Sequence, residues 1–284
     1  MKSSWLIPAA LIRVRLSLMV TFSALIGFLI APNQSWRDAL LLISGVFFLA
    51  CGTSALNQIQ ERGRDRLMER TKKRPLVTGH ISLQAAGLMV ISMLTAGSLA
   101  LALIGWTPLL LGIANIFFYN ALYTPLKPRT PLAILPGALV GAIPPVMGWT
   151  AAGGALFHPT ILYIAAFMFL WQLPHFWLLL VAHAKDYERA GFKGFPKFLN
   201  PQHIRFIIFS WTLISSLFLF SFPLFGIHFL WSQVWLLTFI NVSFIALFYF
   251  LLFHKALSPY NKKAFIVLNS YALTILLLFV WMFQ

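Results

Sequence analysis

The sequence predicts an all-α, polytopic membrane protein with nine transmembrane helices bundled around a central cavity. Three observations support this class: the composition, the apolar runs and the placement of the basic residues. Of the 284 residues, 60% are hydrophobic and 10% are charged, whereas soluble domains carry about 25% charged residues. A chain so poor in charge is expected to place its helices in lipid.

Nine apolar runs approach the ~20 residues that a spanning helix needs. Together they occupy about 180 positions, so we expect a single transmembrane domain over residues 1–284. The fourth run is the shortest, and prolines that bracket or interrupt the fifth predict a kinked, buried helix. The runs are roughly 14–31, 38–56, 83–105, 108–123, 132–150, 160–183, 206–223, 231–253 and 263–283.

The basic residues are distributed asymmetrically between the two sides of the membrane. If the N-terminus is cytoplasmic, 20 of the 21 Lys and Arg residues lie in or next to cytoplasmic segments, and only Arg37 lies on the other side. This pattern follows the positive-inside rule. It predicts a multi-pass protein of the cell (inner) membrane, with a cytoplasmic N-terminus and the C-terminus on the opposite side. It also explains the net charge of +15 without a nucleic-acid partner. The cytoplasmic segments are 1–13, 57–82, 124–131, 184–205 and 254–262.

The acidic residues gather in the two largest cytoplasmic segments. Asp38 is the exception, and it begins the second helix as a favourable charge near a helix N-terminus. The other five of the six are Glu61, Asp65, Glu69, Asp186 and Glu188.

Asn57, Glu61 and Asp65 are spaced i, i+4, i+8. If the second span continues as a helix, each step of four residues turns ~400°, so the three side chains share one face. They supply oxygen ligands of the kind that magnesium prefers, beside Arg70 and Arg74, which suit phosphate. This composition is typical of a metal–diphosphate site. The alternative is an ordinary charged loop that obeys the positive-inside rule.

Two further polar residues lie in or near the sixth span. Asp186, near its end, is either a second metal ligand that faces the first cluster or a solvated loop acid. His175 lies within the span, where ionisable groups are costly and often functional. Histidine is also a common metal ligand. The alternative for His175 is a core residue that bonds a neighbouring carbonyl.

The segment 57–76 contains the run Met-x-Arg-Thr-x-x-Arg-Pro. It resembles the first aspartate-rich motif of the UbiA superfamily of intramembrane prenyltransferases, and within it the protoheme IX farnesyltransferase (heme O synthase) family. Residues 123–149 resemble that family's middle segment, and residues 171–191 resemble its second acidic motif. The resemblance covers about residues 13–200, and the last three spans match only in hydropathy. The sequence departs from the family at Gly63, Pro128, Ala133 and Gln172-Leu173.

The resemblance implies a role for each residue of the candidate site. The metal-binding, catalytic residues would be Asn57, Glu61, Asp65 and Asp186. The diphosphate-binding residues would be Arg70, Arg74, Lys127 and Arg129. The acceptor-binding residues would be His175 and Tyr123.

The resemblance also implies the reaction, which transfers a farnesyl group from farnesyl diphosphate to a vinyl group of heme B and yields heme O. Magnesium would be the cofactor, and a terminal oxidase or heme A synthase would be a partner in the bilayer. Two alternatives stay open. One is a prenyltransferase acting on a quinone precursor or another aromatic ring. The other is a transporter, although transporters usually place polar groups near the midplane, and here the acids lie at one face.

Overall fold

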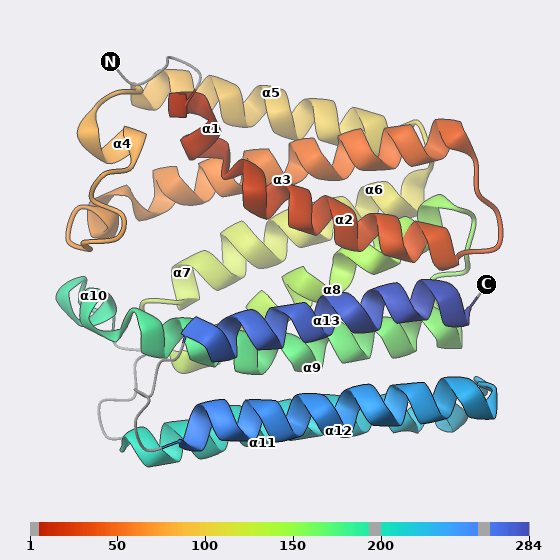
Figure 1. Cartoon of the computed structure of the whole chain (residues 1–284). Helices are drawn as coiled ribbons and strands as arrows, with labels where there is room; N and C mark the ends of the chain where they lie inside the picture. The colour runs from red at the N-terminus through yellow and green to blue at the C-terminus, as the bar shows by residue number, and fades with distance from the viewer. Residues whose placement is uncertain (1–5, 193–199, 255–261, 284) are drawn as a thin grey trace. The chain divides into compact units, whose positions relative to one another are not determined.

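The computed structural model describes residues 6–192, 200–254 and 262–283, and this part of the chain is helical with no strand (Figure 1). Among these residues, eight helices are long and apolar enough to cross a membrane. The first predicted span, 14–31, is not among these eight, because it forms the shorter apolar helix Val14–Ile30 of 17 residues. The chain is therefore a multi-pass, all-α membrane protein, and the difference from the predicted nine full-length spans lies in this first helix.

The chain divides into two compact units, and each is described by itself. The first comprises Met1–Leu156 and Lys185–Phe195, and the second comprises Phe157–Ala184 and Pro196–Gln284. The single domain and the central cavity stay predictions.

The first unit is built around α3, which packs against α2 and α5, while α8 packs against α2 and α6. Within this unit, α4, α7 and α10 lie at the same end, at the left of Figure 1. Its elements are α1 (Leu6–Ile12), α2 (Val14–Ile30), α3 (Trp36–Asp65), α4 (Pro75–Thr78), α5 (Leu83–Ala102), α6 (Trp106–Ile116), the π-helical η1 (Phe117–Tyr123), α7 (Thr124–Leu126), the 3₁₀ turn η2 (Pro131–Ala133), α8 (Ile134–Ala151) and α10 (Ala184–Arg189).

Helix α3 extends well past the run that predicted it. It begins at the Ser35 cap, whose hydroxyl accepts a hydrogen bond from the Asp38 amide, and it ends only at Asp65. The predicted run stopped at about residue 56 because the next turns carry polar side chains. Several of these polar side chains are buried in the unit. The hydrophobic run therefore marked the start of the helix well and its end poorly.

Helices α2 and α8 approach each other closely through glycines. A Cβ on Gly148 would lie 1.8 Å from the Ala24 carbonyl oxygen, and one on Gly27 would lie 1.9 Å from the Pro145 oxygen. Small residues allow this approach of two backbones in lipid. The fifth predicted span, which corresponds to α8, was expected to be buried. This is confirmed, because the segment Pro131–Ala151 has the largest buried share of the eight spans, 56%.

The fourth predicted span is a continuous segment, Trp106–Leu126, that changes its helical register. Its π-helical turn η1 ends where the Thr124 amide donates to the Tyr119 carbonyl, five residues earlier. The Thr124 hydroxyl donates to the same oxygen at 2.8 Å. Such π-helical turns occur frequently at functional sites, and this one lies just before Lys127.

The second unit contains α9 (Pro159–Ala182), α11 (Pro201–Phe218), the 3₁₀ segment η3 (Leu219–Phe225), α12 (Trp231–Phe253) and α13 (Lys262–Met282). Helix α9 packs against α11 and α13, and α12 packs against α11 and α13. Buried polar groups join three of these helices, since Asn241 accepts hydrogen bonds from Ser216 and from Tyr271. Hydrogen bonds between helices satisfy polar groups that lipid cannot.

Candidate active site

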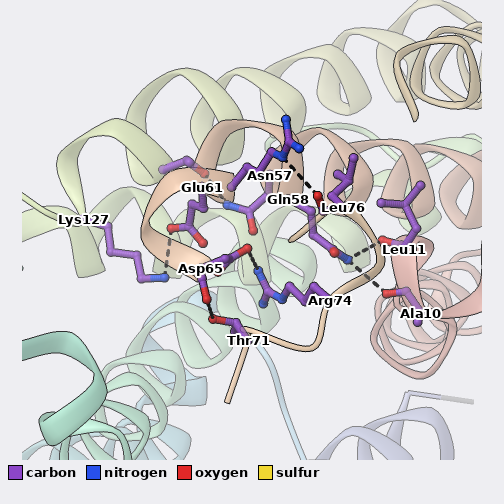
Figure 2. A network of polar contacts seen from close by, with 12 residues as sticks. Ala10, Leu11, Asn57, Gln58, Glu61, Asp65, Thr71, Arg74, Leu76 and Lys127 are labelled. Carbon is purple, nitrogen blue, oxygen red and sulfur yellow. Dashed lines mark hydrogen bonds and ion pairs between the residues drawn. The ribbon is translucent and has the colours of Figure 1, made fainter. Parts of the chain in front are cut away.

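The last two turns of α3 present Asn57, Glu61 and Asp65, which we call the acid face. Their exposed fractions are 2%, 3% and 0%, so all three are buried. Figure 2 shows Glu61 directed toward Lys127 and Asp65 toward Arg74. The helix continues to Asp65, so the predicted spacing on one helix is realised.

Glu61 pairs with Lys127, whose Nζ lies 3.1 Å from Glu61 Oε1. The ammonium also lies within 5.3–5.8 Å of the ring centres of Tyr123, Tyr187 and Phe192, distances at which aromatic rings attract a cation. Burial opposes the charge of Lys127, but Tyr123, Tyr187 and Glu61 outweigh it and raise the pKa of the ammonium. Lys127 is therefore a fixed cation beside the acid face.

Asp65 pairs with Arg74, whose Nη1 lies 2.5 Å from Asp65 Oδ2. The chain turns back after α3, and the buried Thr71 donates its hydroxyl to the Asp65 carbonyl at 3.0 Å. The motif residue Met68 is also buried and anchors the same turn. Burial lowers the pKa of Arg74, but arginine stays charged at any physiological pH.

Asn57 joins α3 to the segment that follows η1. Its amide Nδ2 donates to the Thr124 hydroxyl at 3.0 Å. One turn further along, Gln60 donates to the Asn120 carbonyl and accepts from the Asn120 side chain, at 3.0 and 3.1 Å. These contacts fasten η1 to the acid face and so position Lys127. Neither Gln60 nor Asn120 is predicted from the sequence, because both side chains are uncharged and the prediction followed the acidic and basic residues.

Asp186 contacts the loop after α3. Its two carboxylate oxygens accept hydrogen bonds from the backbone amides of Glu69 and Arg70, at 3.0 and 3.3 Å. Within residues 6–192, 200–254 and 262–283, no group of three His, Cys, Asp or Glu side chains gathers around one point. The role of Asp186 as a metal ligand stays a prediction. In the structure its carboxylate holds the loop that follows α3.

Arg70 and Arg129, the other two predicted diphosphate ligands, are exposed. In the described part of the chain, no side-chain hydrogen bond or ion pair joins either of them to the acid face. Arg74 and Lys127 are thus brought to the predicted site, and the roles of Arg70 and Arg129 stay predictions.

The acid face fits a magnesium ion by its chemistry. It offers two carboxylates and one amide, and oxygen ligands of this kind are those that magnesium prefers. Asp65 Oδ1 is buried and has no hydrogen-bond partner. A buried acceptor without a partner is costly, so this atom would gain from a cation.

His175 lies on α9 in the second unit, between aromatic rings. The ring centres of Trp171 and Phe265 are each 5.1 Å from that of His175. The side chain of Asn269 is hydrogen-bonded to the imidazole. Its amide Nδ2 donates to the Phe265 carbonyl at 2.6 Å, and in this orientation its oxygen can accept from the ring.

The other imidazole nitrogen, His175 Nδ1, is buried without a hydrogen-bond partner. If the ring donates to Asn269 through Nε2, then Nδ1 carries a lone pair. No motif pointed to Asn269, because the last three spans resemble the family only in hydropathy.

The sequence matches the UbiA prenyltransferase family over residues 20–283. It is 47% identical over 181 residues to a protoheme IX farnesyltransferase of Geobacter sulfurreducens, covering 64% of this chain and 67% of the relative. It is 42% identical over 183 residues to that of Nitratidesulfovibrio vulgaris, covering 64% of each. It is 36% identical over 208 residues to a protoheme IX farnesyltransferase of Cytophaga hutchinsonii, and the match covers 72% of each chain. The chain thus matches about two thirds of the length of the first two relatives.

Solved structures share the fold at low sequence identity. A digeranylgeranylglyceryl phosphate synthase gives a TM-score of 0.77 at 18% identity, with 98% of both chains covered. A UbiA homolog from Archaeoglobus fulgidus bound to GPP and Mg2+ gives 0.74 at 18% identity, with 97% of both chains covered. A UbiA homolog from Aeropyrum pernix gives 0.74 at 21% identity, covering 93% of this chain and 96% of that one.

Proposed function

Because the chain belongs to the UbiA prenyltransferase family, we propose that it transfers a farnesyl group from farnesyl diphosphate to a vinyl group of heme B, giving heme O. The observation that carries the diphosphate half is the buried acid face with Lys127 and Arg74 opposite it. The acceptor half is supported by relatives named protoheme IX farnesyltransferase at 36% to 47% identity.

Magnesium is the proposed cofactor. Asn57, Glu61 and Asp65 would hold it, with Asp186 contributing from α10. When bound, magnesium would neutralise charge on the departing diphosphate. The unpartnered Asp65 Oδ1 supports this assignment, as does the related structure from Archaeoglobus fulgidus that is bound to GPP and Mg2+.

Lys127 and Arg74 now neutralise Glu61 and Asp65. Once the carboxylates bind a cation, these two side chains would turn their hydrogen bonds to the diphosphate oxygens, where charge develops as the C1–O bond breaks. Arg70 and Arg129 would add contacts from the exposed edge. Their combined effect is to stabilise the leaving group.

The electron pair of the C1–O bond leaves with the diphosphate, and the farnesyl C1 becomes an allylic cation. The heme vinyl group attacks this carbon and forms the new carbon–carbon bond. Water then adds to the resulting cation and loses a proton, which gives the hydroxyethylfarnesyl side chain. The surrounding membrane helices would exclude bulk water until that step.

His175 and Tyr123 are the proposed acceptor-binding residues. Neutral imidazole is a common ligand of iron, and the unpartnered His175 Nδ1 supports a contact with the heme. The hydrogen bond from the imidazole to Asn269 would orient the ring, as the partners of metal-binding histidines usually do.

We place the acid face on the cytoplasmic side of the inner membrane, with the N-terminus on the same side and the C-terminus opposite. The basis is the alternation of the basic residues, in which only Arg37 lies on the other side. The product would pass within the bilayer to a terminal oxidase or to heme A synthase.

An acceptor-exchange assay tests the proposal. The purified chain is incubated with magnesium and farnesyl diphosphate, together with either heme B or an aromatic quinone precursor. The products are then separated, and their masses are determined by mass spectrometry. We expect a farnesylated product from heme B alone. Transfer to the quinone precursor without transfer to heme would contradict the heme assignment and leave the prenyl transfer standing.

A further inference from the structure

The first membrane helix is interrupted at Arg13, between α1 and α2. Arg13 has φ 49° and ψ 54°, the left-handed conformation. Among the described residues, it is the one non-glycine residue with a positive φ. A residue with a Cβ disfavours this conformation, and strained residues of this kind cluster at functional sites.

At this interruption, side chains donate hydrogen bonds to backbone carbonyl groups that have no partner within α1. Gln58 Nε2 on α3 donates to the carbonyl oxygens of Ala10 and Leu11 at 3.0 and 2.7 Å (Figure 2). The Ser17 hydroxyl donates to the Ile12 carbonyl at 3.1 Å. The last carbonyls of a helix have no partner within it, and here three of them are satisfied from outside. The break is therefore fixed to α3.

Gln58 follows the acid-face residue Asn57 directly, so the same turn of α3 anchors Arg13 and carries the site. The charge of Arg13 acts on both Glu61 and Arg74. Helix α1, which ends just before Arg13, packs against α3 and also against α4, which begins directly after Arg74. Two arginines are thus held close enough to repel each other, beside Lys127 and only two carboxylates. An anionic ligand would relieve this repulsion.

We propose that Arg13 is a further diphosphate-binding cation, next to Lys127 and Arg74 at the acid face, and that Gln58 is the positioning residue that holds the backbone break from which Arg13 extends. The inference rests on the proposed function, and specifically on its diphosphate half. In the sequence, Arg13 is only one of the basic residues that follow the positive-inside pattern.

The test is to measure binding of inorganic pyrophosphate with magnesium by calorimetry. Arg13→Asn removes the charge and keeps a residue that tolerates the left-handed conformation. Arg15→Asn is the matched control, because Arg15 is exposed on the first turn of α2. A lost charge-assisted hydrogen bond corresponds to about tenfold or more in affinity. We expect this loss in Arg13→Asn and unchanged affinity in Arg15→Asn.

Gln58→Leu tests the positioning role, because it removes both donors together with the buried, unpartnered Gln58 Oε1. We expect weaker pyrophosphate binding while Arg13 is present and no additional loss in the double variant with Arg13→Asn. Additive losses would overturn the positioning role, since a structural effect alone adds independently.

Parent-like affinity in Arg13→Asn would overturn the inference. A parent chain that binds no pyrophosphate would overturn both the inference and the diphosphate half of the proposed function. If only heme fails as an acceptor, pyrophosphate binding and its dependence on Arg13 remain.

Discussion

At the scale of single residues, the site depends on two buried carboxylates that come from one helix and are neutralised by two other segments. Glu61 is neutralised by Lys127, 66 positions later, and Asp65 by Arg74, nine positions later. An isolated buried charge is strongly unfavourable, whereas a paired one is tolerated. The ion pairs therefore let both carboxylates keep their charges while buried, and under the proposed function the same two cations would bind the diphosphate.

Asp65→Asn should abolish most turnover while the protein stays folded. Asparagine keeps the volume and removes the negative charge that a magnesium ion requires. We expect the turnover rate at limiting magnesium to fall about 100-fold or more, and thermal unfolding to confirm that the variant is folded. Glu69→Gln is the control, because Glu69 is exposed and pairs with Lys72 outside the acid face. Near-normal turnover of Asp65→Asn would remove it from the site.

His175→Ala and Asn269→Leu separate a heme-binding role from a packing role. If the imidazole binds heme iron and Asn269 orients it, both variants should weaken heme binding more than farnesyl diphosphate binding. If His175 only fills the core, its loss should cost ~1–3 kcal/mol of stability and affect both ligands alike. Heme and diphosphate titrations on the same purified variants decide between them, and parent-like heme affinity in His175→Ala excludes the contact.

The acid face could be predicted from the sequence because its spacing is local, i, i+4, i+8 on one helix. The partners of these residues could not. Pairing between Glu61 and Lys127 depends on how α3 packs against η1, and the Asp186 contact depends on a loop 116 positions away. A sequence without aligned relatives gives no signal for such distant contacts, nor for Asn269 in a span recognised only by its hydropathy.

At the scale of elements, hydrophobic runs located all nine helices to within a few residues at most ends. They failed at the end of α3, where buried polar residues continue the helix, and inside Trp106–Leu126, where η1 changes the register. Hydropathy reports contact with lipid, whereas these two features depend on polar contacts between helices. Both features belong to the proposed site.

Gly148→Ala should destabilise the first unit. The new methyl group would overlap the Ala24 carbonyl oxygen, and overpacking of this kind costs about 1–3 kcal/mol. Gly87→Ala on α5 is the control, because its Cβ would meet nothing within 4 Å and alanine favours a helix. Thermal unfolding in detergent should show a loss for Gly148→Ala and none for Gly87→Ala. Equal stability of both variants would contradict the close packing of α2 on α8.

At the scale of the whole molecule, the alternation of basic residues predicts the orientation in the membrane. Reporter fusions after Gln284 and within residues 57–82 should report opposite sides, because an odd number of predicted crossings, seven, lies between the two sites. If both reporters lie on the same side, at least one of the seven spans predicted after residue 82 does not cross.

The central claim is that this chain farnesylates heme, and a mass spectrum of membrane hemes tests it most directly. Hemes are extracted from cells that lack any other heme farnesyltransferase and that express the parent chain, Asp65→Asn or neither. The account predicts heme O only with the parent chain. Identical hemes in all three samples, with the parent chain folded in the membrane and farnesyl diphosphate present, would contradict it.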